Sequence, residues 1–311
     1  MTTALYTHPA CLGHETPPGH PESADRLRAI LEELQGISGL SREEAPPASR
    51  SDLARAHDPA LIERVLVTLA EEAAREHFVR VDADTAMSAG SPEAALRAAG
   101  AVIAAADAVM AGKVTNAFCA VRPPGHHAER KRAMGFCLFN NVAIGSIHLR
   151  DTYGLNRIAV IDFDVHHGNG TQDIFWNDPD LFYASTHQWP LYPGTGQPSE
   201  KGVANNILNA PLPPGAGSEA FRAAFLKIVL PALDSFAPEF VFISAGFDAH
   251  RADPLAELRL TEDDFAWATR EICALAAKHC SGRVVSALEG GYDLDALARS
   301  AGAHVRALME A

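Results

Sequence analysis

Residues 157–172, RIAVIDFDVHHGNGTQ, decide the fold of this chain and the place of its chemistry. Residues 158–161 are a short apolar run, mostly β-branched, which is typical of a strand buried in a sheet. Beyond that run apolar and polar residues alternate, so Asp162, Asp164 and His166 are expected on one side of an extended strand. The stretch therefore predicts a central strand that carries two carboxylates and an imidazole.

These polar side chains are expected to be shielded from water, because a central parallel strand is covered on both faces. Burying an unpaired carboxylate is costly, so a bound cation is a simple explanation for the acidic pair. Carboxylate oxygen together with imidazole nitrogen suits zinc or a similar divalent ion. The alternative is a network of hydrogen bonds among the same side chains, without a metal.

The whole chain of 311 residues, of which 47% are hydrophobic, is long enough to bury one large core. The order strand, loop, helix recurs, which predicts a single α/β domain over residues 1–311, with a mostly parallel central sheet and helices on both faces. Strands are expected at residues 2–6, 115–121, 158–161, 181–186, 240–245 and 283–288. Helices are expected at residues 23–34, 56–75, 91–110, 141–149, 218–233 and 261–278.

Polar clusters follow four of these strands at their carboxyl ends. They are His126 with His127, Asp164 with His166, Asp253, and Tyr292. Ligands of open α/β sheets bind outside the carboxyl ends of the strands, so these side chains are expected to converge on one site. This convergence favours a metal or catalytic site over the metal-free network.

Charge and composition narrow the choice of partners and compartment. The formal net charge of -13 and the absence of a basic stripe argue against nucleic acid or an anionic membrane as a partner, whereas cationic substrates remain compatible. No stretch has the pattern of an export signal or a membrane span. Five cysteines without a CxxC pair argue against a disulfide framework, so we expect a reduced, cytoplasmic setting.

Five motifs identify a family. They are RPPGHHA (122–128), GFCLFNN (135–141), DFDVHHGNGTQ (162–172), SAGFDAH (244–250) and EGGY (289–292). In composition and order they resemble the zinc-dependent histone deacetylase family, in its class II-like bacterial branch of histone deacetylase-like amidohydrolases. The resemblance covers nearly the whole chain and implies the arginase/deacetylase fold.

The resemblance also implies the bound ions. One zinc ion per chain is expected, and its ligands matched by position are Asp164, His166 and Asp253. The sequence leaves open whether zinc or iron(II) is the metal in the cell. A structural potassium ion is expected at Asp162 and Ser185, and a second monovalent site at backbone carbonyls within residues 175–181.

The catalytic groups implied by the resemblance are the tandem histidines and a tyrosine. We expect His127 to accept a proton from the attacking water while His126 supports it. Matched by position, Asp162 orients His126 and Asn169 orients His127. Tyr292 is expected to donate its hydroxyl group to the developing oxyanion.

The substrate channel is implied less strongly. Phe136 and Tyr192 match two aromatic walls, and Leu255 stands where polyamine-selective relatives tend to carry an acidic residue. Asp84 matches a carboxylate at the rim, and Arg26 an arginine of an internal channel. The two rings fit an ordinary core as well, and the two charged residues an ordinary surface or helix start.

Three functions are therefore considered. The leading expectation is a zinc-dependent amidohydrolase that removes acetyl or other acyl groups from lysine side chains or related amines. The second is an acetylpolyamine deacetylase, which the acidic composition and Glu257 favour and Leu255 disfavours. The third is a non-catalytic, zinc-containing protein that binds acylated ligands, which the complete set of catalytic residues disfavours. A homo-oligomer is compatible with each of them.

Overall fold

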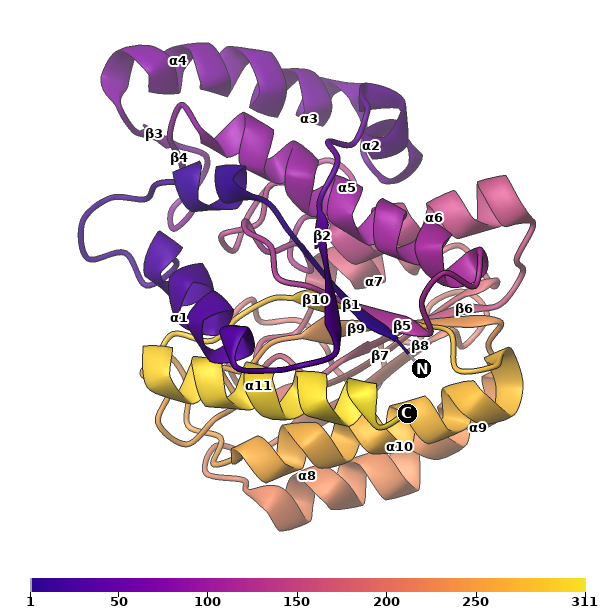
Figure 1. The fold of residues 1–311 in the computed structure, drawn as a ribbon. Helices are drawn as coiled ribbons and strands as arrows, with labels where there is room; N and C mark the ends of the chain where they lie inside the picture. Colours follow the sequence, from indigo (N-terminus) through magenta and orange to yellow (C-terminus); the bar gives the residue numbers. More distant parts are fainter. Residues whose placement is uncertain (1) are drawn as a thin grey trace.

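A computed structural model describes residues 2–311, and its centre is a sheet of eight parallel strands (Figure 1). The strands are β1 (Thr3–Thr7), β2 (Leu40–Glu44), β5 (Asn116–Cys119), β6 (Ile158–Asp162), β7 (Leu181–Gln188), β8 (Ile207–Leu212), β9 (Phe240–Ala245) and β10 (Val284–Leu288). Their order across the sheet is β2-β1-β5-β10-β9-β6-β7-β8. A separate antiparallel pair joins β3 (Val79–Arg80) and β4 (Ala86–Met87).

Helices cover both faces of the sheet, as the sequence predicts (Figure 1). On one face lie α1 (Ala24–Gln35), α8 (Ser218–Ala224), α9 (Leu230–Phe236), α10 (Glu262–Cys280) and α11 (Leu294–Met309). On the other face lie α2 (Arg50–Ala56), α3 (Pro59–Glu63), α4 (Leu69–Glu76), α5 (Ser91–Met110), α6 (Asn141–Tyr153) and α7 (Asn169–Phe175). A 3₁₀ turn, Pro9–Gly13, follows β1, and two π-helical turns, Arg64–Thr68 and Phe225–Val229, lie within the α3–α4 and α8–α9 runs.

The core follows from the composition of these elements. Every residue of β6, β9 and β10 is buried, because helices cover both faces of the central strands. Helix α5 is rich in alanine, and its small side chains let neighbouring backbone come close. A side chain at Gly100 would collide with the backbone of Pro46 and Ala48, so glycine is required at that contact. No helix within the described residues 2–311 is long and apolar enough to cross a membrane.

The central strand is shorter than the alternating pattern suggested. Strand β6 ends at Asp162, and residues 163–168 form neither helix nor strand. The reason is local: Asp162 Oδ1 accepts a hydrogen bond from Asp164 N, and Asp164 Oδ1 accepts one from His166 N. These side chains bind their own backbone and so replace the bonds of the sheet. The expectation of one extended face through His166 was wrong, although its polar residues still converge.

The predicted helix 56–75 is present as α3, the π-helical turn Arg64–Thr68 and α4, which together run from Pro59 to Glu76; only its start was placed too early. A separate helix that was not predicted, α2, precedes it: Ser49 and Asp52 form its capping box, and it ends at Ala56 with His57 as the C-cap. Asp58 then caps α3, whose first residue is Pro59. Strands β2 and β8, helices α7 and α11, and the pair of β3 and β4 were not expected.

The strand order positions the site. Strands β5, β10, β9 and β6 are consecutive neighbours in the middle of the sheet. All run parallel, so their carboxyl ends lie along one edge. The segments that follow them carry the four polar clusters of the sequence.

Candidate functional site

Acidic and imidazole side chains meet where β6 and β9 end. Asp164 and His166 follow β6, and Asp248 follows β9. One potential ligand atom from each residue lies within 4.8 Å of the others, and all three side chains are buried. His166 Nδ1 is 3.2 Å from Asp164 Oδ1 and 3.1 Å from Asp248 Oδ2. We call these three residues the acid–imidazole cluster.

The acid–imidazole cluster stabilises positive charge. Burial disfavours a charged imidazole, yet hydrogen bonds and charge from Asp164 and Asp248 raise the pKa of His166 to about 10. Burial and the charge of Asp164 raise the pKa of Asp248. A divalent cation would neutralise both carboxylates, and oxygen with imidazole nitrogen is a suitable donor set for zinc or iron(II). The residues present therefore fit a divalent metal ion.

Backbone groups hold the carboxylates of this cluster in place. Gly290 N donates to Asp164 Oδ2 at 2.8 Å, and Val165 N donates to Asp248 Oδ1 at 2.8 Å. A side chain at Gly246 would collide with the Asp164 carboxylate, and one at Gly290 with both carboxylates. The two glycines thus allow the backbone to pack directly against the acids.

Asp253, the predicted third metal ligand, lies outside the acid–imidazole cluster. Its Oδ1 accepts a hydrogen bond from Leu255 N at 3.0 Å, and its Oδ2 accepts one from Tyr292 N at 2.7 Å. Burial and the charge of Asp248 raise the pKa of Asp253 to about 7. Asp248 belongs to the cluster because its Oδ2 lies 3.1 Å from His166 Nδ1. The assignment of Asp253 as a metal ligand stays a prediction.

His126 is set up as the charged member of the tandem pair. Its Nδ1 lies 2.9 Å from Asp162 Oδ2, and its Nε2 lies 3.8 Å from Asp164 Oδ2. Burial opposes the charge, but the carboxylates of Asp164 and Asp162 outweigh it and raise the pKa of His126 well above its usual value. The Asp162 contact is the one that the sequence predicted.

His127 has the opposite environment. Its Nδ1 lies 2.7 Å from Asn169 Oδ1, so its predicted partner is in place but carries no charge. Burial and the nearby positive charges of His126 and His166 lower the pKa of His127 well below its usual value. The two neighbouring histidines, with ring centroids 4.0 Å apart, are therefore driven toward different protonation states.

The loop after β10 carries Tyr292 and is held from beneath. Arg26, fully buried, donates from Nε to the Gly291 carbonyl and from Nη2 to the Glu289 carbonyl, each at 2.5 Å. Its guanidinium carbon also lies 4.9 Å from the centroid of the Tyr292 ring. Glu22, also buried, pairs with the Nη1 of Arg26 at 3.0 Å. Arg26 is thus a buried residue that fixes the loop of Tyr292, rather than a surface charge.

A hollow of about 230 Å³ opens above the acid–imidazole cluster. Its lining contains all three predicted substrate-binding residues together with His127, His166 and Tyr292; in full it is Asp84, His127, Gly135, Phe136, His166, Leu191, Tyr192, Leu255 and Tyr292. The Tyr192 ring lies 5.2 Å from the His127 ring, and the Phe136 ring lies 5.9 Å from the Tyr292 ring, centroid to centroid. We call this cavity the entrance hollow.

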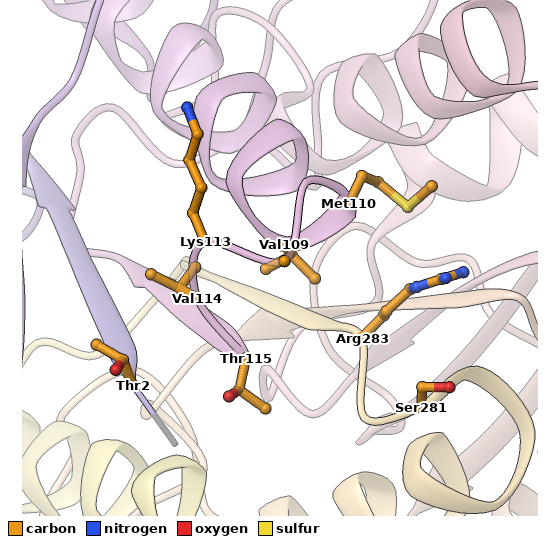
Figure 2. Close-up of a pocket in the computed structure, with 9 residues that line it drawn as sticks. Thr2, Val109, Met110, Lys113, Val114, Thr115, Ser281 and Arg283 are labelled. Carbon is orange, nitrogen blue, oxygen red and sulfur yellow. The ribbon is translucent and has the colours of Figure 1, made fainter.

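A larger hollow of about 540 Å³ lies at the other end of the sheet, near the start of β1, β5 and β10. It is lined by Thr2, Val109, Met110, Gly112, Lys113, Val114, Thr115, Ser281 and Arg283. Figure 2 shows the side chains of Lys113 and Arg283 extending in different directions. Its polar groups do not converge on one point, unlike those of the entrance hollow.

The predicted potassium site involves two strands in register. Asp162 of β6 and Ser185 of β7 are paired neighbours and both are buried. Asp162 Oδ2 also accepts a hydrogen bond from the Tyr183 hydroxyl at 3.0 Å, and Ser185 Oγ lies 2.9 Å from His187 Nδ1. Potassium binding by Asp162 and Ser185 stays a prediction.

A side chain contacts the carbonyls of the expected second monovalent site, and ion binding at these carbonyls stays a prediction. Asn206 Nδ2 donates toward the carbonyls of Phe175, Asp178 and Leu181, at 2.9, 3.0 and 2.9 Å. These carbonyls do converge, as expected, but an amide nitrogen lies at their focus. No local pattern predicts this contact, because Asn206 lies in a loop and far along the chain from its partners.

Two acidic residues of the site were missed from the sequence. Asp248 lies inside the SAGFDAH motif, and its position directly after a buried strand was an available signal. Glu129 follows the tandem histidines, and its Oε1 accepts a hydrogen bond from Asn169 Nδ2 at 2.8 Å. No spacing rule links residues 129 and 169, so only the folded chain reveals that contact.

Comparison with known proteins agrees with this architecture. The model of the histone deacetylase domain matches residues 20–308. A probable deacetylase of Archaeoglobus fulgidus is 41% identical over 95% of this chain and 82% of its own length. The histone deacetylase-like amidohydrolase of Pseudomonas aeruginosa is 40% identical over 91% of this chain and 74% of its own. The crystal structure of the HDA15 HD domain superposes with a TM-score of 0.92, at 34% identity, over 99% of this chain and 88% of that one.

The fold is thus the arginase/deacetylase α/β fold, with a buried acid–imidazole cluster at the carboxyl edge of its sheet. Within that class, the chain belongs to the histone deacetylase family.

Proposed function

We propose that this chain is a metal-dependent amidohydrolase that removes acetyl or other acyl groups from lysine side chains or related amines. One observation carries the proposal. His166 of the acid–imidazole cluster, the histidine of lowered pKa, His127, and Tyr292 all line one hollow at the carboxyl edge of the sheet. A metal ligand set, a base and an oxyanion donor are the groups that amide hydrolysis by an activated water requires.

The metal we propose is zinc, with one ion per chain. Asp164 and His166 would hold it, together with Asp253 as the resemblance implies or Asp248 as the cluster suggests. The ion would polarise the acyl carbonyl and acidify a bound water. Iron(II) fits the same donors, so the identity of the metal in the cell is a separate question.

His127 is the proposed base. Asn169 Oδ1 accepts a hydrogen bond from a protonated Nδ1 of His127, which leaves Nε2 free to take a proton from the attacking water. Its lowered pKa keeps it neutral before the reaction. The same nitrogen would later protonate the leaving amine.

His126 supports this transfer without taking part in it directly. The carboxylates of Asp162 and Asp164 keep His126 protonated, as its raised pKa indicates. The positive charge of His126 disfavours protonation of the neighbouring His127. His127 is therefore neutral when the attacking water approaches. The pair therefore combines a fixed charge with a free base.

Tyr292 is the proposed donor to the oxyanion. Burial raises the pKa of its hydroxyl well above the usual value, so the group stays protonated and able to donate. Arg26 holds the carbonyls of the adjacent loop and faces the ring, which fixes the direction of the phenol.

The entrance hollow suits a narrow aliphatic stem. Phe136 and Tyr192 line it with aromatic rings, and Leu255 adds an apolar side chain. These residues favour an acyl-lysine stem. Asp84, also in the lining, favours a second cationic group on the substrate, so an acetylpolyamine is the second candidate. A protein that only binds acylated ligands has no need of the separate protonation states of His126 and His127.

The test compares kcat/KM of the zinc-loaded protein for acetyl-lysine peptides, N-acetylputrescine and N-acetylspermidine. A tenfold preference corresponds to about 1.4 kcal/mol of transition-state discrimination. We expect peptides to be preferred, which would support Leu255 as the selective residue. Preference for polyamines would shift the assignment to the second candidate. Binding of all three without turnover would contradict the proposed hydrolysis.

A further inference from the structure

Glu129 does not contact His127, the proposed base, directly; one side chain links the two residues. The side chain of Asn169 stands between them: its Oδ1 is 2.7 Å from His127 Nδ1, and its Nδ2 is 2.8 Å from Glu129 Oε1. Met134 Sδ lies 3.4 Å from the same Nδ2. The three side chains form a continuous chain of hydrogen bonds from a partly exposed carboxylate to a buried imidazole.

The chemistry of these groups fixes the direction of each bond. An ionised carboxylate only accepts hydrogen bonds, so Glu129 must receive the N–H of Asn169. The amide then has only its oxygen to offer on the other side, and His127 Nδ1 must carry a proton to donate to it. A neutral imidazole with a proton on Nδ1 has its free lone pair on Nε2.

Without the carboxylate this order is lost. An asparagine amide can turn over and present either its oxygen or its nitrogen, at almost the same shape. If the nitrogen faced His127, the ring would accept at Nδ1 and hold its proton at Nε2, where it could not act as a base. For His126 no such ambiguity exists, because Asp162 is itself a carboxylate.

Glu129 is also held firmly enough to act in this way. Its carbonyl accepts a hydrogen bond from His57 Nδ1 at 3.0 Å, and the other ring nitrogen of His57 accepts one from Asn140 N at 2.8 Å. Its backbone N donates to the Arg132 carbonyl at 2.9 Å. The segment that carries Glu129 is thereby joined to the start of α6.

We propose that Glu129 is a positioning residue, which acts through Asn169 to keep the Nδ1–H tautomer of His127 and so leaves Nε2 free. This inference rests on the proposed function, because it assigns His127 as the base. The arrangement places a carboxylate one hydrogen bond further from His127 than Asp162 is from His126. It orients the base without putting a negative charge beside it.

The experiment exchanges the two groups. In Glu129→Gln the carboxylate becomes an amide, which can donate a hydrogen bond to Asn169 as well as accept one. The Asn169 amide can then adopt either orientation, so both tautomers of His127 become available. Asn169→Asp alone places two carboxylates in contact, which is unfavourable. The double variant Glu129→Gln/Asn169→Asp restores one carboxylate and one amide in reversed order, and the new carboxylate again accepts from His127 Nδ1. Glu219→Gln, at an exposed residue of α8, is the matched control.

Two readouts are needed. Nitrogen-15 NMR of the imidazole rings in the zinc-loaded proteins reports the tautomer of His127, whose signals are assigned by their loss in His127→Gln. Steady-state kinetics report kcat and KM separately. A wrong tautomer of a catalytic histidine can cost up to about 10⁴-fold, so a mixture in Glu129→Gln should lower kcat by at least about tenfold, with KM within about twofold.

We expect the double variant to recover the Nδ1–H tautomer and a kcat within about threefold of the original, and Glu219→Gln to change neither readout. A single Nδ1–H tautomer and unchanged kcat in Glu129→Gln would overturn the proposal. Loss of activity with an unchanged tautomer in that variant, not recovered in the double variant, would overturn it as well. Absence of turnover in the unsubstituted protein would contradict the proposed function, while the NMR result would still decide the role of Glu129.

Discussion

The two ends of the central sheet differ in what they bury. At the carboxyl end, the entrance hollow of about 230 Å³ lies over two buried aspartates and a buried histidine. At the amino end, a hollow of about 540 Å³ is lined by hydroxyl groups and by two cationic side chains, of which Lys113 is exposed (Figure 2). The larger cavity, as the described residues line it, therefore lacks the convergent acidic and imidazole groups that the smaller one has.

The difference shows what makes a site in this fold. Parallel strands bring the segments that follow them to a common edge, so residues distant in sequence converge there. Convergence then creates costs, because buried like charges must be compensated by a cation, a proton or a hydrogen bond. Within residues 2–311, the lining of the amino-end hollow has no cluster of buried like charges that needs compensation, and its cationic side chains can extend toward solvent.

The largest expected difference between the two ends is tested by removing one charged side chain at each end. Asp164→Asn removes a carboxylate of the acid–imidazole cluster, and Arg283→Ala removes a cation of the amino-end hollow. We expect Asp164→Asn to abolish zinc binding and to lower kcat/KM by more than about 1,000-fold, or roughly 4 kcal/mol. Arg283→Ala should stay within about twofold. Metal analysis and kinetics check both. A comparable loss in Arg283→Ala would show that the amino end takes part in function.

The next largest effect is expected at Tyr292. Tyr292→Phe keeps the ring beside Phe136 and Arg26 but removes the proposed donor to the oxyanion. We expect kcat to fall by about 10²–10³-fold while zinc stays bound, since one oxyanion donor contributes about that much. The check is kcat measured alongside zinc content. Turnover near the original value would remove Tyr292 from the mechanism.

At the carboxyl end, two aspartates compete for the role of third zinc ligand. Asp248 hydrogen-bonds His166 Nδ1, whereas the hydrogen-bond partners of Asp253 are the backbone N–H groups of Leu255 and Tyr292, so its carboxylate is not committed to another side chain. We therefore expect Asp253→Asn to weaken zinc binding more than Asp248→Asn, in which a supporting contact is lost at a cost of about 10–100-fold. Competition with a zinc chelator measures both. The reverse order would assign Asp248 as the ligand and Asp253 as the support.

The smallest effect concerns a buried histidine away from the cluster. His304 lies between Thr269 Oγ1 and Ser286 Oγ, at 2.6 and 2.8 Å, and burial lowers its pKa to about 3. The unfolded chain binds a proton near pH 6.5 and the folded chain does not, so acid favours unfolding below that pH. From pH 7 to 5 this residue should cost about 2 kcal/mol of unfolding free energy.

Denaturant unfolding of His304→Gln at the two pH values checks this. The variant is expected to be less stable at pH 7, because its two hydroxyl partners are disturbed, but to lose about 2 kcal/mol less than the original between pH 7 and 5. Equal losses in the two proteins would mean that His304 takes up a proton in the folded state.

Much of this structure follows from local patterns. The apolar runs of β6, β9 and β10 predicted the buried strands closely, and the polar residues after each strand predicted the edge at which the site forms. The tandem histidines were paired correctly with Asp162 and Asn169 through the family resemblance.

What the sequence did not predict depends on contacts between distant segments. Asp248 joins the cluster only because β9 lies beside β6, an order that no local pattern encodes. Asn206 contacts a ring of carbonyls more than twenty residues away in sequence. Strand β6 ends early because Asp162 and Asp164 bind their own backbone, which periodicity does not register.

The most direct measurement is a zinc titration of the metal-free protein, followed by turnover of an acetyl-lysine peptide and of N-acetylputrescine. The acid–imidazole cluster predicts that activity is absent without metal, rises linearly, and saturates at about one equivalent of zinc per chain. Hydrolysis by the metal-free protein, or no hydrolysis of either substrate at any zinc content, would contradict the proposed metal-dependent amidohydrolase.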